Sequence, residues 1–394
     1  MCLAIEENVS PQVSYKRFRR RIIRRSASAS TPVATGGQCE PSFEFDTVCQ
    51  RLELDSSLGN PPGPDERRHH VQPFAVLNQS EIVQGKTLMK FGAPSLLNDY
   101  YTNLLDCSCD GMVALALSSS VYLWNSKTRA LEGFLAPSPR RGPSHCHSIS
   151  SLCWSRDGTA LCVGTRRGEV QLWDVEQQQA TRCLVSHLTA VGALSWKQHL
   201  LSSGSVLGHI HHLDPRAPAP AVGSSVQSEG ICSLQWSPGD DWLASGSTGG
   251  LLHVWDSNIT GVKRSRRPLT TMRQPSAVKA MGWCPWQRNA IATGGGWKDG
   301  ELRIWDTQSG SCVTSVNTNS QICSLRWAET MRYLVTGHGV PHHQVTGWTW
   351  DFPSVRPMYE LTGHSQRVLH LAINPDNDQI FSAGADQRFL IWGP

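Results

Sequence analysis

Short apolar runs separated by turns of Gly, Ser and Thr recur along this chain from about residue 100 onward. In each unit an apolar run enters a small-residue turn, and a β-branched or aliphatic run then closes the unit. The seven closing residues are Trp124, Trp173, Leu213, Trp255, Trp305, Trp348 and Trp392, spaced 49, 40, 42, 50, 43 and 44 residues apart. Runs of this kind predict antiparallel strands joined by tight turns.

Another apolar run opens each unit and is the expected innermost strand. It ends on Cys107 in the first unit, on Ile373 in the last, and otherwise on Trp154, Trp196, Trp236, Trp283 and Trp327. One small sheet cannot bury both of its faces, so the units must stack on one another. The period is typical of WD repeats. We therefore predict an all-β fold, a seven-bladed WD-repeat β-propeller with a disordered N-terminal arm.

Small residues end the middle run of every unit, as in LLSSGS and IATGGG. We expect glycine here because the turn needs positive φ. On this interpretation Gly294, Gly295 and Gly296 form a structural turn and not a loop that cradles a ligand.

The last blade needs an outer strand from elsewhere, because Trp392 ends its third strand and only two residues follow. An open sheet edge would be an aggregation hazard. The run KTLMKF, Lys86 to Phe91, is the natural donor and would close the ring. We therefore predict a propeller over residues 86–394, closed by an N-terminal outer strand. Residues 1–85, rich in Ser, Pro and charge, are predicted to be a largely disordered arm.

The arm contains one strongly basic run, although the formal net charge of the whole chain is only +4. Its cations are Lys16, Arg17, Arg19, Arg20, Arg21, Arg24 and Arg25. Nuclear import, binding to a phosphate backbone and docking on an acidic partner would each use such a run, and a solvated tail is an equally good interpretation. Basic runs have low specificity, so nucleic acid is not the partner we expect.

Composition indicates where the protein works. No apolar run approaches the roughly 20 residues of a membrane helix. The N-terminal sequence MCLAIEENVS lacks a secretory signal, and the 13 cysteines include no C-x-x-C pair. We therefore expect a soluble, monomeric propeller with reduced thiols in the cytoplasm and/or nucleus, without membrane contact.

Apparent catalytic and metal motifs are weak. Gly85-Lys86-Thr87 resembles the end of a phosphate-binding loop, but the upstream glycine that such a loop needs is Ser80. The histidines at 209, 211, 212, 342 and 343 show no recurring ligand spacing. No nucleophile, base and orienting group can be assembled from the strand ends. We therefore expect a protein that is not an enzyme, with no cofactor and no metal.

Several strings exceed what any propeller requires, among them LLNDYYTNLLDCS, EVQLWDVEQQQ, LSSGSVLGHIHHLD, AVKAMGWCPWQRNAIATGGG and QICSLRW. They resemble the Cdc20/Fizzy family of anaphase-promoting complex activators, and the resemblance extends over the whole propeller. It implies a substrate-recognition adaptor and activator of that ubiquitin ligase. Its partners would be subunits of the complex and client proteins that carry short degron peptides.

The resemblance also implies two binding sites. A Lys-Glu-Asn peptide would bind the upper face at Asp106, Gln321 and Arg367, with Trp297 nearby. A destruction box would lie in a groove with Asp99 and Gln387, where Gln387 replaces a second acidic residue of the family. For Asp106, a hydrogen bond at a turn or strand end is the alternative interpretation.

Two docking motifs of the family are missing from this sequence. The arm contains no Asp-Arg-Phe/Tyr-Ile-Pro motif, and no Ile-Arg pair precedes Pro394. The alternative hypothesis is therefore a propeller scaffold or competitor that binds peptides without activating the ligase.

Overall fold

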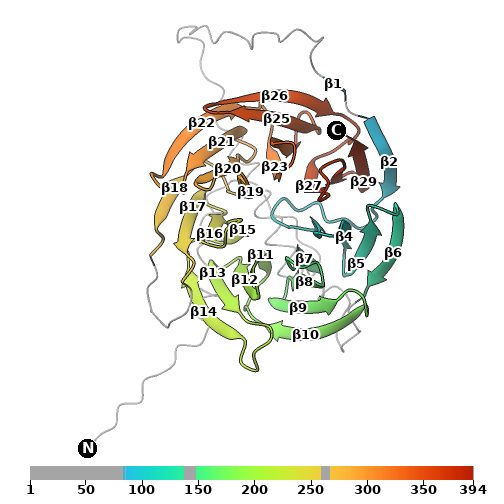
Figure 1. The fold of residues 1–394 in the computed structure, drawn as a ribbon, viewed down its shortest axis with the longest axis vertical. Helices are drawn as coiled ribbons and strands as arrows, with labels where there is room; N and C mark the ends of the chain where they lie inside the picture. The colour runs from blue at the N-terminus through green and yellow to red at the C-terminus, as the bar shows by residue number, and fades with distance from the viewer. Residues whose placement is uncertain (1–82, 85, 137–147, 259–266, 394) are drawn as a thin grey trace, which may run out of the picture. The chain divides into compact units, whose positions relative to one another are not determined.

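The computed structural model of the chain describes residues 83–84, 86–136, 148–258 and 267–393. These residues form strands, turns and loops, and none of them lies in a helix. Seven sheets are arranged around a common axis, so the predicted seven-bladed propeller is confirmed (Figure 1). Most of the predicted disordered arm, including its basic run, lies outside the described residues, but Val83 and Gln84 at its end form a strand.

The first four blades each contain four consecutive antiparallel strands. Blade 1 has β3 (Leu105–Cys107), β4 (Met112–Leu117), β5 (Ser120–Asn125) and β6 (Ala130–Leu135); blade 2 has β7 (Ile149–Trp154), β8 (Ala160–Thr165), β9 (Glu169–Asp174) and β10 (Gln179–Val185); blade 3 has β11 (Val191–Lys197), β12 (Leu200–Ser205), β13 (His209–Leu213) and β14 (Ala221–Val226); blade 4 has β15 (Ile231–Trp236), β16 (Trp242–Ser247), β17 (Leu251–Asp256) and β18 (Thr270–Arg273).

Blade 5 repeats this order, and blades 6 and 7 recruit strands from the N-terminal side of blade 1. Blade 5 has β19 (Ala280–Trp283), β20 (Ala290–Gly294), β21 (Glu301–Asp306) and β22 (Ser311–Asn317); blade 6 has β23 (Ile322–Ala328), β24 (Tyr333–His338), β25 (Val345–Asp351), β26 (Ser354–Leu361) and the added β1 (Val83–Gln84); blade 7 has β27 (Val368–Ile373), β28 (Ile380–Gly384), β29 (Arg388–Gly393) and the added β2 (Lys86–Gly92).

The ring is joined by pairing between the two ends of the propeller sequence. Strand β2 lies antiparallel to β29, with Thr87 opposite Trp392 and Phe91 opposite Phe389. Just before it, β1 pairs in parallel with β26 of blade 6, with Val83 opposite Tyr359. Both pairings fill sheet edges that would otherwise expose unpaired backbone groups.

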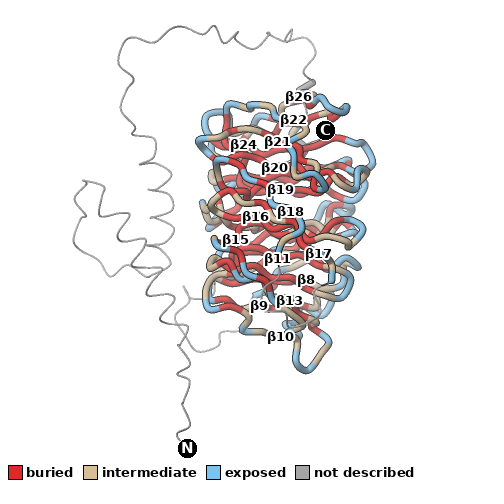
Figure 2. The backbone as a smooth tube through the Cα atoms, turned by 90° about the vertical axis from the view of Figure 1, so that its left-hand side faces the viewer, coloured by how far each residue is buried: buried red, intermediate tan, exposed pale blue. Residues whose placement is uncertain are grey.

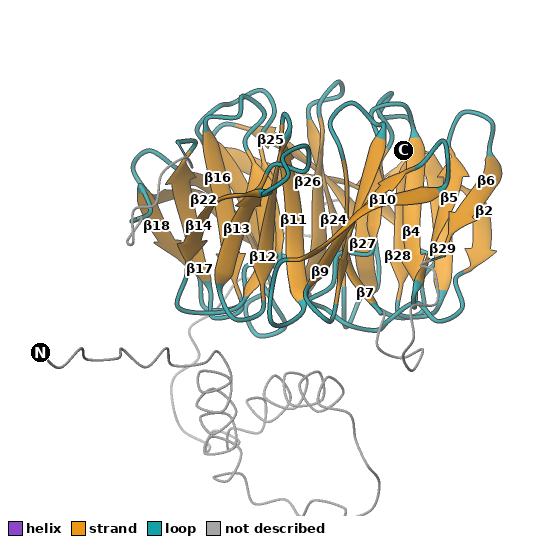
Figure 3. Ribbon diagram, turned by 90° about the horizontal axis from the view of Figure 1, so that it is seen from below, coloured by secondary structure: helices purple, strands orange, loops and turns teal. Residues whose placement is uncertain are grey.

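Side chains of the inner three strands are mostly buried between neighbouring blades, while the outer strands alternate with solvent (Figure 2). Loops gather at the two ends of the strands (Figure 3). We call the end where inner strands begin the upper face and the end where they finish the lower face. Ile149 therefore lies at the upper end of β7, and Trp154 lies at its lower end.

The recurring closing tryptophan serves more than packing. In blades 4 to 7 its indole N–H donates to a Ser or Thr hydroxyl on the neighbouring middle strand, which satisfies a buried donor. These bonds are Trp255 to Ser245 at 2.8 Å, Trp305 to Thr293 at 2.8 Å, Trp348 to Thr336 at 2.7 Å and Trp392 to Ser382 at 2.8 Å. In blade 7 the network continues, because Ser382 also contacts His364 at 2.7 Å.

The glycine that ends a middle strand is required for a different reason from the one we expected. A Cβ atom on Gly294 would lie 2.4 Å from Ile322, the first residue of the next inner strand, and one on Gly204 would lie 2.5 Å from Ile231. Positive φ is found instead at Gly300, with a φ of 59°. The expectation of positive φ at Gly294–Gly296 is therefore wrong, since close approach of the next blade demands the small residue.

Candidate functional site

A connecting segment crosses the upper end of the central channel. Residues 93–104, which we call the strap, join β2 of blade 7 to β3 of blade 1. Tyr100 in the strap is buried against Ala277 and Cys323, and its hydroxyl donates to the carbonyl of Ile322 at 3.3 Å. The strap therefore packs against blades 5 and 6, far from it in sequence.

Asn103 holds the end of the strap across the channel. Its Nδ2 atom donates to the carbonyl of Gly192 at 2.9 Å and to that of Cys232 at 3.2 Å. These carbonyls belong to the inner strands of blades 3 and 4. Because one amide bridges three blades, the upper end of the channel is closed by a defined contact.

Two of the predicted upper-face residues lie next to each other. A Cβ atom on Gly339 would be 2.8 Å from Oε1 of Gln321 and 3.4 Å from Cγ of Arg367. The Gly339 amide donates to the backbone carbonyl of Gln321 at 2.8 Å. Arg367 in turn donates from Nη2 to Oδ1 of Asn98 in the strap at 2.6 Å. The structure therefore brings Gln321, Arg367 and the strap together.

This group includes buried polar atoms that make no hydrogen bond with the described residues. They are Nε2 and Oε1 of Gln321 and Nδ1 of His343. Burial lowers the pKa of His343, and the charge of Arg367 acts in the same direction while Asp386 opposes it. Buried polar atoms without a partner are rare in proteins, and a ligand is one physical explanation. Sequence reasoning placed His343 only among surface or channel histidines.

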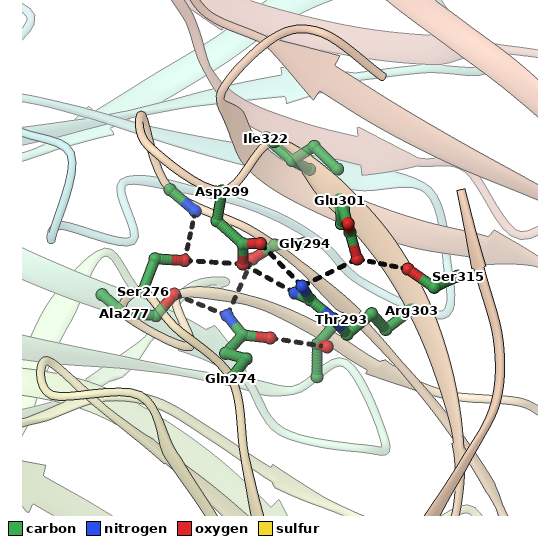
Figure 4. A network of polar contacts seen from close by, with 12 residues as sticks. Gln274, Ser276, Ala277, Thr293, Gly294, Asp299, Glu301, Arg303, Ser315 and Ile322 are labelled. Carbon is green, nitrogen blue, oxygen red and sulfur yellow. Dashed lines mark hydrogen bonds and ion pairs between the residues drawn. The ribbon is translucent and has the colours of Figure 1, made fainter. Parts of the chain in front are cut away.

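Trp297 lies on an adjacent upper-face loop, and its side chain is 40% exposed. Figure 4 shows the polar network below this loop, in which Asp299 pairs with both Nη atoms of Arg303 at 2.6 Å. Ser276 binds Asp299 at 3.0 Å and accepts a hydrogen bond from the Gly296 amide at 2.7 Å. The loop is therefore rigidly supported.

The loop that bears Trp297 is also connected to the strand that begins beside Gln321. The Ile322 amide donates to the Gly295 carbonyl at 2.9 Å. Trp297 thus flanks the group formed by Gln321 and Arg367.

Asp106 occupies a different place, on the inner strand β3 facing the channel. Its Oδ2 atom accepts a hydrogen bond from the backbone amide of Trp154 in the next blade. Blades 3 and 4 make the same contact with neutral side chains, and the three bonds are Asp106 to Trp154 at 2.9 Å, Ser195 to Trp236 at 2.9 Å and Gln235 to Trp283 at 3.0 Å. Burial raises the pKa of Asp106, although the charge of Arg326 and two backbone amides oppose the shift. None of these contacts connects Asp106 with Gln321 or Arg367.

The two predicted groove residues, Asp99 and Gln387, do not hydrogen-bond to each other or share a hydrogen-bond partner among the described residues. Asp99 forms an ion pair with Arg166 at 2.8 Å and accepts the Tyr101 amide at 2.9 Å. Gln387 is exposed, with a φ of 58°, and its carbonyl accepts the Ala93 amide at 2.7 Å. Gln387 lines a hollow of about 630 Å³ between the β28–β29 turn and the start of the strap. An arginine ligand of Asp99 would have to compete with Arg166.

The histidines considered for a metal are distributed over several environments. His211 stacks on His187 with ring centroids 4.3 Å apart, and His212 faces the opposite side of its strand, bonded to Ser202 at 2.8 Å. Within the described residues, no group of three or more His, Cys, Asp or Glu side chains could hold a metal ion. The same described residues include no helix that could span a membrane.

A model of the CDC20/Fizzy WD40 domain matches residues 91–392. This match spans all seven blades of the described propeller. The chain belongs to the Cdc20/Fizzy family.

Relatives in that family are similar over most of this chain. It is 36% identical over 326 residues to "Cell division cycle 20.1, cofactor of APC complex" of Arabidopsis thaliana, covering 82% of this chain and 70% of that protein. It is 39% identical over 302 residues to "Anaphase-promoting complex subunit cdc20" of Dictyostelium discoideum, covering 76% and 58%.

The solved structures include a Cdc20/Fizzy-like match in "Crystal Structure of Mitotic Checkpoint Complex". That chain superposes with a TM-score of 0.73 at 33% sequence identity, covering 84% of this chain and 99% of the other. The family resemblance inferred from the sequence motifs is therefore confirmed.

Proposed function

We propose that this Cdc20/Fizzy-family protein is a substrate-recognition adaptor and activator of the anaphase-promoting complex, and that it does no catalysis of its own. Family membership supports this role, because relatives carry the names of a cofactor and a subunit of that complex. Its partners would be subunits of the complex and client proteins with short degron motifs, encountered in the cytoplasm and/or nucleus.

The observation that carries the peptide-binding proposal is the group at Gln321. Both polar atoms of its amide lack a hydrogen-bond partner among the described residues, and Arg367 lies beside it. An extended peptide offers amide groups for the first and, through a glutamate, a carboxylate for the second. Trp297 adds an exposed apolar surface at the edge of the same site. These groups match the amide groups and the glutamate of a Lys-Glu-Asn peptide.

The peptide lysine needs an acidic partner, and Asp106 is the residue that the family resemblance implies. Its carboxylate is already engaged at the lower part of the channel, so this element of the proposal needs its own variant. Asp106→Asn retains an oxygen that can accept the Trp154 amide and removes only the negative charge.

The destruction-box groove is the second proposed site. Asp99 would capture the arginine of the motif and Gln387 would contact the same peptide. Because Asp99 is already paired with Arg166, we propose weaker arginine capture here than at a site with two free carboxylates.

Peptide binding is measured best with the full chain and a fluorescent Lys-Glu-Asn peptide. Arg367→Gln is expected to weaken binding by about tenfold, the effect of losing one charge-assisted hydrogen bond. Arg356→Gln is the matched control, because this exposed arginine lies on the outer strand β26. Equal affinity of both variants and wild type would reject the upper-face site.

Activation is tested separately by affinity purification from dividing cells. Recovery of anaphase-promoting complex subunits with the wild-type chain supports an adaptor. Clients recovered without the complex would instead support the scaffold or competitor, and loss of clients in Arg367→Gln assigns them to the upper face.

A further inference from the structure

The central channel contains a polar cavity that the peptide-binding proposal uses only through Asp106. Its volume is about 260 Å³, and inner strands of blades 1 to 6 line it. Asn103 bridges its upper end, while Trp154, Trp196 and Trp236 lie where their inner strands finish. A ligand would therefore enter from the lower face.

Two cationic side chains in this cavity form no ion pair with the described residues. Lys279 is 4% exposed, and its Nζ atom donates a long hydrogen bond of 3.4 Å to the Cys323 carbonyl. Arg326 is half-buried and donates from Nη1 to the Leu325 carbonyl at 3.0 Å. Among the described residues, no carboxylate forms an ion pair with either of them. Most of their donor capacity is therefore unused.

The surrounding groups do not balance this charge. Asp106 is the one carboxylate that lines the cavity, and it interacts with Arg326 through its charge. One negative charge cannot balance both Lys279 and Arg326. Arg156 at the lower end is already paired with Asp240 at 2.6 Å. Burial, together with the charge of Arg326, lowers the pKa of Lys279 to about 8. Two cations thus destabilise each other in a confined space, which a bound anion would relieve.

His370 shows that both charges act on the same region. Burial and then the charges of Lys279 and Arg326 hold its pKa well below the usual range, so it adds no third positive charge near neutral pH. Its Nε2 atom is buried and has no partner among the described residues.

We propose that Lys279 and Arg326 bind one small oxyanion in the channel, either inorganic phosphate or a small phosphate monoester. A guanidinium offers a planar fork that matches phosphate oxygens, and an ammonium adds a compact charge with three donors. The cavity has the volume of roughly eight water molecules in the liquid, which accommodates a phosphate with some of its water. The site opens away from Gln321 and Arg367, and it shares only Asp106 with the peptide-binding proposal.

The test uses the full chain, its thermal unfolding midpoint and a series of inorganic phosphate concentrations at constant ionic strength. A ligand that binds only the folded state raises the midpoint with concentration. We expect this rise for wild type and expect Arg326→Gln and Lys279→Met to weaken the apparent affinity by about tenfold or more. Arg356→Gln on the outer strand is the control and should respond like wild type.

A variant that gains affinity guards against simple loss of folding. Asp106→Asn keeps the bond to the Trp154 amide but removes the one carboxylate of the cavity, so it should bind phosphate more tightly than wild type. Line broadening of the phosphorus resonance provides a direct readout in all variants. Glycerol phosphate in place of phosphate tells whether a monoester or the free ion binds better.

An equal response of wild type, Arg326→Gln and Asp106→Asn would overturn the proposal. So would a phosphate response that chloride reproduces at the same ionic strength, because that reports general screening and not a site.

Discussion

Blades 6 and 7 place a similar polar network under the upper face and complete it differently. In blade 7, Trp392 donates to Ser382, Ser382 contacts His364, and the other ring nitrogen of His364 contacts Asp386 at 3.0 Å. In blade 6 the equivalent tryptophan and threonine meet a histidine, His338, whose Nδ1 atom has no partner among the described residues.

The difference separates two uses of buried polar groups. In blade 7 the hydrogen-bond network ends at the carboxylate of Asp386. Burial acts to raise the pKa of this group, but hydrogen bonds, above all with His364, hold the pKa below its usual range. In blade 6 the unpartnered atoms extend outward to Gln321 and His343, beside Arg367. A satisfied network stabilises the fold, whereas buried polar groups without a partner reduce stability unless a ligand satisfies them.

The largest expected effect comes from breaking the complete network. Ser382→Ala leaves the Trp392 indole N–H and Nε2 of His364 without their partner in a fully buried position. Stranding these groups should reduce the free energy of unfolding by about 2–4 kcal/mol. Chemical denaturation measures the change, with the exposed Ser365→Ala as control. Equal stability of the two variants would show that the blade 7 network is not stabilising.

The pH dependence of stability tests the blade 6 network through His338. Burial lowers the pKa of His338 from 6.5 to about 3. The unfolded chain therefore binds a proton that the folded chain excludes, and this contribution to stability is lost as pH falls from about 6.5 towards 3.

His338→Gln removes one titrating group while it keeps a side chain able to bond Thr336. Blade 5 already uses Gln274 for this purpose, with Thr293 at 2.9 Å. The variant should flatten the acid slope of stability by up to about 1.4 kcal/mol per pH unit. Denaturation curves at several pH values measure this slope. An unchanged slope would assign the acid sensitivity to other groups such as His187, because burial also lowers the pKa of His187 to about 3.

The blades could be predicted from sequence because closing and inner-strand tryptophans repeat at the spacing of the structural unit. The same pattern does not predict where along the channel axis a side chain lies. Asp106 on β3 follows Asn103 of the strap by three residues, a separation of about 10 Å in extended backbone. It therefore faces the lower channel while Asn103 closes the upper end.

Side-chain pairings between residues far apart in the sequence could not be predicted either. Arg166 neutralises Asp99 across 67 positions, and Arg367 reaches Asn98 across 269. No local periodicity records such contacts, because they arise only when the ring closes and the strap crosses it. The neighbouring positions of Gln321 and Arg367 followed from the family resemblance and not from spacing.

A smaller effect on stability is expected at the incomplete site. Gln321→Leu replaces a buried amide that makes no side-chain hydrogen bond with the described residues. The free energy of unfolding should stay within about 1 kcal/mol of wild type or rise, since a desolvated polar group is removed. Denaturation of Gln321→Leu beside Ser382→Ala gives the comparison directly. A loss as large as that of Ser382→Ala would mean that Gln321 is structural.

The smallest stability change is expected for Arg367→Gln. Its contact with Asn98 joins partly exposed side chains, and substitutions of this kind usually change unfolding free energy by less than about 0.5 kcal/mol. Peptide affinity should nevertheless fall about tenfold, because the guanidinium would lose a charge-assisted bond to the ligand. Parallel denaturation and peptide titration of one preparation measure both quantities. Weakened binding together with an equal loss of stability would show that Arg367 acts by holding the strap and not by contacting the peptide.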